Sequence, residues 1–164
     1  ARLLRAGADK VSINTAAVLN PALITAGANQ FGSQAIVCAI DAAYDSSTDS
    51  YWVYTNGGQQ KTKLDAVDWA AKAVKLGAGE LLVTSMDKDG TKSGFDLRLY
   101  QRISHKVRVP IIASGGAGVV QDFINLYQHT TVTGALAASI FHFQELTIEQ
   151  VKKGLQKEGV PVRL

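Results

Sequence analysis

The chain has 164 residues, of which 46% are hydrophobic and 19% charged, so we expect residues 1–164 to form a single globular domain with a substantial core. The net charge of +3 includes no basic stripe interleaved with aromatic residues, and no apolar run approaches the roughly 20 residues of a membrane span, so neither nucleic acid nor a membrane is an expected partner. The single cysteine and the absence of a signal-peptide pattern in the first residues favour a cytoplasmic location.

Short apolar runs alternate with helical patterns along the chain. The expected strands are Lys10–Asn14, Ala35–Asp41, Glu80–Thr84, Val109–Ala113 and Ala135–Ala138. Strands that are apolar throughout and separated by helices predict a parallel sheet covered on both faces.

Helix signals occupy the intervals between these strands. Residues 2–7 resemble the last turns of a helix, and Asn20 is expected to cap a helix that begins at Pro21. Apolar residues between positions 64 and 74 recur at helical spacing, and Gly77 ends that helix.

The remaining elements follow the same logic. Asp96 is expected to begin a helix. The following helix carries Phe123 and Leu126 on its buried side, and the last helix begins at a capping box formed by residues 147–150. In residues 51–59, aromatic residues precede Asn-Gly-Gly, which suggests a small hairpin inserted after the second strand. The chain therefore reads as five βα units with one insertion.

Polar residues follow all five expected strands. They are Asn14 and Thr15, then Asp41, then Ser85, Asp87 and Asp89, then Ser114, Gly115 and Gly116, and finally Ser139. Ligands of parallel α/β folds bind beyond the carboxyl ends of the strands. Any one of these residues could be only a helix cap or a turn residue, but their recurrence after every strand favours a binding site.

Asp41 ends the run AIVCAI, and strand alternation places it on one face with Val37 and Ala39. A carboxylate at this rim can act as a general acid or base. The same alternation turns Cys38 to the other face, where we expect an apolar filler and not a nucleophile.

The stretch VPIIASGGAG, residues 109–118, places several glycines where a strand hands over to a helix. Glycine allows unusual dihedral angles and close approach of a backbone to a ligand, and helix-start N–H groups suit a phosphate. A tight turn without a ligand is the alternative at this point.

We expect neither a metal nor a cofactor. Aligning residues 87–98 with a calcium loop puts Lys92 at the glycine position and Arg98 at the glutamate position. The three histidines show no metal-ligand spacing with one another or with Cys38.

Five segments together resemble the cyclase subunit of imidazole glycerol phosphate synthase, an enzyme of histidine biosynthesis. They are GADKVSINTAA, AIDA, LLVTSMDKDGTKSGFD, PIIASGGAG and GALAASIFHF, in matching order and spacing. The resemblance implies a TIM (β/α)8 barrel that takes ammonia from a glutaminase partner. Its substrate carries a phosphate at each end, and its products are imidazole glycerol phosphate and an aminoimidazole carboxamide ribotide.

The resemblance also implies roles for individual residues. Asp41 and Asp89 correspond to catalytic positions. Phosphate or substrate contacts fall on Asn14, Thr15, Thr84, Gly90, Ser114, Gly115, Gly116, Ala138 and Ser139. At the opposite ends of the strands, Lys10 and Glu80 resemble members of the ammonia gate, and Asp9 resembles a contact to the glutaminase.

By the same comparison, the chain is expected to begin within the third helix of the barrel, as a parallel (βα)5 half of it. The aspartate of the first strand and part of the second phosphate site would then be absent. Unpaired strand edges and an uncovered inner face favour a homo-dimer or larger oligomer. We expect that face to carry Val11, Ile13, Val37, Ala39, Leu82 and Ile112, or their alternates.

Three functional hypotheses remain open. The half-barrel binds a phosphorylated substrate with little activity alone, or it becomes active when a second chain completes the barrel, or it is a self-associating scaffold without catalysis. A doubly wound sheet with helices on both faces is the alternative to an open half-barrel.

Overall fold

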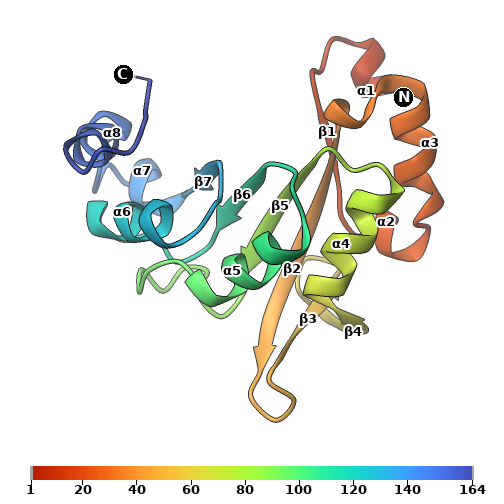
Figure 1. The fold of residues 1–164 in the computed structure, drawn as a ribbon, viewed down its shortest axis with the longest axis horizontal. Helices are drawn as coiled ribbons and strands as arrows, with labels where there is room; N and C mark the ends of the chain where they lie inside the picture. The colour runs from red at the N-terminus through yellow and green to blue at the C-terminus, as the bar shows by residue number, and fades with distance from the viewer. Residues whose placement is uncertain (1, 164) are drawn as a thin grey trace.

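A computed structural model describes residues 2–163. Its elements in chain order are α1 (Arg2–Arg5), β1 (Val11–Ile13), α2 (Thr15–Leu19), α3 (Ala22–Phe31), the 3-10 turn η1 (Ser33–Ala35), β2 (Ile36–Asp45), β3 (Ser50–Thr55), β4 (Gln60–Asp65), α4 (Ala66–Leu76), β5 (Glu80–Ser85), α5 (Leu97–Lys106), β6 (Ile111–Ser114), α6 (Val120–His129), β7 (Gly134–Leu136), α7 (Ser139–His142) and α8 (Ile148–Lys157). The chain runs from α1 and α3 at one end of the molecule to α8 at the other (Figure 1). No helix within residues 2–163 is long and apolar enough to cross a membrane.

All strands belong to one sheet, and its central part is parallel. β2 pairs with β1 and with β5, β5 pairs with β6, and β6 pairs with β7, each in parallel. Beyond its pairing with β1, β2 continues and pairs antiparallel with β3, which pairs antiparallel with β4. The antiparallel part therefore consists of the end of β2, β3 and β4, residues 41–65, and extends beyond the stretch of 51–59 in which the sequence suggested a hairpin.

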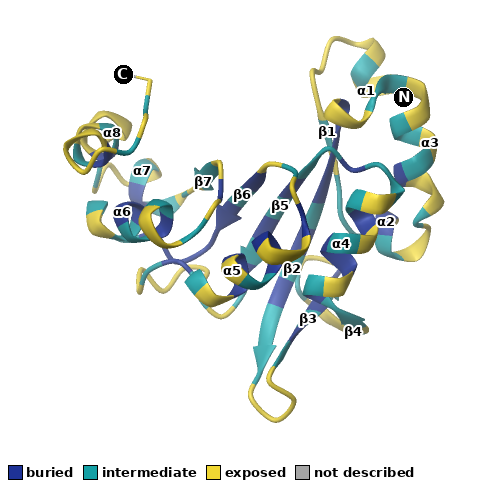
Figure 2. Ribbon diagram, viewed as in Figure 1, coloured by how far each residue is buried: buried dark blue, intermediate teal, exposed yellow. Residues whose placement is uncertain are grey.

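Helices cover only one face of the parallel strands. On that face Cys38, Leu81 and Ala113 are fully buried, whereas their neighbours Leu82 and Ile112 on the other face are only partly buried (Figure 2). Helices α3, α4, α5 and α6 pack successively against one another, and α6 packs against α8. The prediction of a sheet covered on both faces was wrong for the described residues, because apolar residues alternate between a covered and an open face.

In β1, the residues on the open face are the alternates of those named from the sequence. Val11 and Ile13 are in register with Ile36 and Cys38, so they face the helices, and Ser12 lies on the open face with Val37. The alternate parity applies to this strand, because a shift of one residue moves every side chain to the opposite face.

Several helix boundaries confirm the sequence signals. Gly77 ends α4 in a left-handed conformation, the Asp96 side chain caps α5, and Thr147 with Gln150 forms the capping box of α8. The signal at Asn20 was wrong, because Asn20 follows an unpredicted short helix, α2, and Pro21 stands immediately before α3.

Candidate functional site

Three of the predicted residues lie in one row across the open face. Asp41, Thr84 and Ser114 are register partners on β2, β5 and β6. Asn14 follows β1 and donates from its Nδ2 to Asp41 Oδ2 at 2.9 Å. Asn14 Oδ1 is buried and has no hydrogen-bond partner within residues 2–163, so it can accept from a bound ligand.

A cavity of about 260 Å³ lies beside this row, at the carboxyl ends of β6 and β7. It is lined by Asp89, Gly90, Ser114, Gly115, Gly116, Ala117, Leu136, Ala137, Ala138 and Ser139. The structure thus brings seven predicted residues together from three separate loops: Asp89, Gly90, Ser114, Gly115, Gly116, Ala138 and Ser139. Leu136, Ala137 and Ala117 were missed, since apolar side chains give no chemical signal for a binding site in a sequence.

Backbone N–H groups and the hydroxyls of Ser114 and Ser139 are the donors that this cavity offers. Those of Gly115, Gly116 and Ser139 make no hydrogen bond within the described part of the chain. The first N–H groups before α6 are not available, because those of Gly118 and Val119 donate to Asp122 Oδ2 at 2.8 and 2.9 Å. The candidate anion site, which we call the cradle, therefore combines N–H groups of the loop after β6 with that of the first residue of α7.

The glycines of this stretch are required by a neighbouring loop. A Cβ on Gly115 would lie 2.6 Å from the Ser85 carbonyl oxygen, and one on Gly116 would lie 2.2 Å from the Gly94 carbonyl oxygen. Both residues also have positive φ angles, 94° and 101°. The close backbone approach thus occurs against residues 85–96 of the protein itself, and approach to a ligand stays a prediction.

A buried tyrosine holds the end of β6. Tyr100 donates from its hydroxyl to the Ser114 carbonyl at 2.8 Å and accepts from the Ser114 N–H at 3.1 Å. Burial raises the pKa of Tyr100 far above neutrality, so its hydroxyl remains protonated and can donate. Sequence reasoning missed this contact, since Tyr100 looks like any apolar residue of a helix stripe.

Cys38 lies on the helix-covered face of β2 and is fully buried. Burial raises the pKa of its thiol to about 12. A thiol that stays protonated at neutral pH is a poor nucleophile, in agreement with its predicted role as an apolar filler.

The other predicted residues fall into two further places. Thr15 accepts at its Oγ1 from the N–H of Asn56, at the turn between β3 and β4, with a distance of 2.9 Å. At the amino ends of the strands, Lys10 Nζ and Glu80 Oε2 form an ion pair at 2.6 Å, and Asp9 is exposed beside them.

Residues 1–147 match the family described as histidine biosynthesis protein. The chain belongs to this family. It is 66% identical over 162 residues to the imidazole glycerol phosphate synthase subunit HisF of Lactiplantibacillus plantarum, and 59% identical over 161 residues to the subunit of the same name from Anoxybacillus flavithermus. These matches cover 99% and 98% of the chain but only 64% of each relative, so the chain spans about two-thirds of their length.

Proposed function

We propose that the chain supplies five βα units of a (β/α)8 cyclase barrel that forms imidazole glycerol phosphate, and that its cradle binds one terminal phosphate of the substrate. The parallel strands carry helices on one face and leave the other face open, which supports a barrel segment. The buried residues form one connected core, which supports a single domain. The observation that carries the proposal is the cavity where residues 114–117 meet residues 136–139, since three of its lining residues have unpaired backbone N–H groups.

Asp41 is proposed as the general acid or base of this part of the barrel. It lies on the open face, and Asn14 orients its carboxylate through the 2.9 Å hydrogen bond. Asp89, at the wall of the cradle, is proposed to assist near the substrate. Thr84 lies between Asp41 and Ser114 in the row across the sheet. Thr15 is proposed to belong to the second phosphate site.

Titration with inorganic phosphate at constant ionic strength, followed by amide NMR of the full chain, tests the cradle. We expect the largest shifts at Gly115, Gly116 and Ser139, because their N–H groups are unpaired. Sulfate should produce the same pattern and chloride should not. Shifts confined to other regions would exclude this site.

The opposite end of the sheet fits a partner face. The ion pair of Lys10 and Glu80 lies at the amino ends of the strands, where the family resemblance places the entry of ammonia. We propose that it belongs to this gate and that Asp9 contacts a glutaminase subunit.

Self-association is a second proposal, favoured by the open sheet face. Ala39, Leu82 and Ile112 are only partly covered, and Leu136 is 42% exposed. Apolar surface and strand edges of this kind promote pairing between chains. Light scattering during size exclusion at micromolar concentration should give a dimer or larger; a monomer mass that persists in high salt would contradict this.

A further inference from the structure

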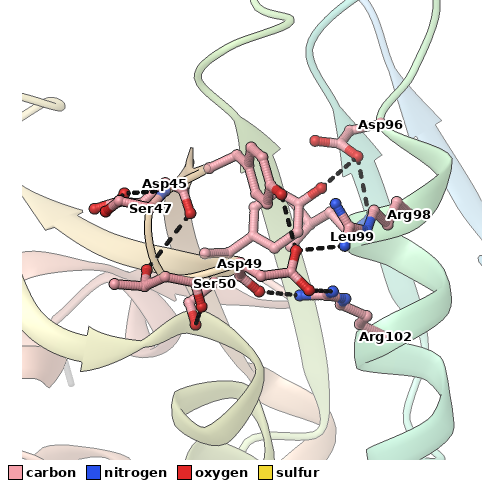
Figure 3. Close-up of polar contacts among 11 residues, drawn as sticks. Asp45, Ser47, Asp49, Ser50, Asp96, Arg98, Leu99 and Arg102 are labelled. Atoms are coloured by element: carbon pink, nitrogen blue, oxygen red, sulfur yellow. Dashed lines mark hydrogen bonds and ion pairs between the residues drawn. The ribbon is translucent and has the colours of Figure 1, made fainter.

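The carboxylate of Asp96 joins three elements that lie far apart in the sequence. Its Oδ2 accepts from Ser85 Oγ, at the end of β5, at 3.0 Å. Its Oδ1 accepts from the hydroxyl of Tyr51, on β3, at 2.9 Å and from the N–H of Leu99, in α5, at 3.1 Å. Figure 3 shows Asp96 beside the first turn of α5. We call Ser85, Asp96 and Tyr51 the clamp.

Two of the three clamp residues are shielded from water, and Asp96 is half-buried. Ser85 is fully buried and Tyr51 is 2% exposed. Burial, followed by the nearby charge of Asp96, raises the pKa of Tyr51, so its hydroxyl stays a donor at neutral pH. Hydrogen bonds to a charged acceptor in such surroundings are stronger than those made in water.

The clamp closes both ends of the loop that forms one wall of the cradle. Within that loop, Asp89 donates from its N–H to the Ser85 carbonyl at 3.0 Å, and Gly94 donates to the Gly116 carbonyl at 2.8 Å. The position of the wall relative to the glycine stretch therefore depends on where the two loop ends are held.

The antiparallel insertion brings Tyr51 to this point and is itself held against α5. Asp49, in the turn between β2 and β3, pairs with Arg98 and Arg102 of that helix (Figure 3). Arg102 also donates to the Asp49 carbonyl at 2.7 Å. The insertion thus acts as a buttress for the loop at residues 85–96.

We propose that Tyr51 and Asp96 are positioning residues of the cradle, which set the phosphate affinity by fixing the loop at residues 85–96. Neither side chain lines the cavity, so their effect is transmitted through the loop. The inference rests on the proposed function to the extent that the cradle is taken to bind phosphate.

Native-state amide exchange of the full chain tests the clamp directly. Tyr51→Phe keeps the ring and removes the hydroxyl, so exchange at Asp89 and Gly94 should accelerate about tenfold while the amides of β5 keep their rates. The dissociation constant for inorganic phosphate should rise about fivefold or more. The matched control is Tyr127→Phe in α6, which removes a hydroxyl that makes no hydrogen bond with the described residues and should change neither quantity.

Asp96→Ser is the second variant, because serine preserves a helix cap but is too short to bridge Ser85 and Tyr51. It should show the same local acceleration as Tyr51→Phe. Unchanged rates at Asp89 and Gly94, or equal acceleration throughout the chain, would overturn the clamp. If the unmodified chain binds no phosphate, the proposed function fails, while the exchange rates still decide the clamp.

Discussion

Gly116→Ala is expected to lower the free energy of unfolding by about 3 kcal/mol and to abolish phosphate binding. The new Cβ would lie 2.2 Å from the Gly94 carbonyl oxygen, a backbone atom that cannot rotate away. Relief of this contact must separate the glycine stretch from the loop that carries Asp89, and the cradle would lose one wall. Urea unfolding and phosphate titration measure the two effects.

Gly7→Ala is the matched control for this substitution. Gly7 has a φ of 105°, close to the 101° of Gly116, but a Cβ there would meet nothing within 4 Å. Its cost should be about 1 kcal/mol, which is the backbone strain alone, and phosphate binding should be unchanged. Equal losses of stability in both variants would show that the close approach at Gly116 is unimportant.

Asp41→Asn is expected to reduce ammonia-dependent turnover at least about 1,000-fold in a completed barrel, since the amide cannot transfer a proton. The experiment combines the chain with the part of the L. plantarum relative that the chain does not match. The match covers 64% of that relative. Phosphorus NMR follows the conversion of one doubly phosphorylated substrate into two singly phosphorylated products. The chain alone should show no detectable turnover.

Asp45→Asn supplies the control, since Asp45 lies on the same strand but pairs with Lys61 at 2.8 Å, outside the candidate site. Turnover should remain within about twofold of the unmodified chain, as for most surface changes. Retention of a tenth or more of the activity by Asp41→Asn would remove this residue from the chemistry. No turnover from the unmodified mixture would contradict the proposed barrel segment.

Local signals in the sequence predicted local structure well. Gly77, Asp96 and Thr147 mark helix boundaries because the capping interaction lies within a few residues of each. Alternation along β2 placed Asp41 and Cys38 on opposite faces for the same reason. In β1 both parities were left open, because a strand of three residues contains too little pattern to decide between them.

Contacts between distant residues could not be predicted. Tyr51 and Asp96 are 45 positions apart, and neither residue type indicates its partner. The glycine stretch was recognised, but its close neighbour at residues 85–96 is visible only in three dimensions. Asp96 was expected as a helix cap, and its second role in the clamp depends on the fold of the insertion.

The position of phosphate in a crystal of the full chain tests the central claim most directly. We expect the ion in the cradle, accepting hydrogen bonds from the N–H groups of Gly115, Gly116 and Ser139. A larger hollow of about 690 Å³, lined in part by Arg108 and His129, lies at the other end of β6 and offers positive charge. Phosphate bound there, with the cradle empty at saturating concentration, would contradict the account.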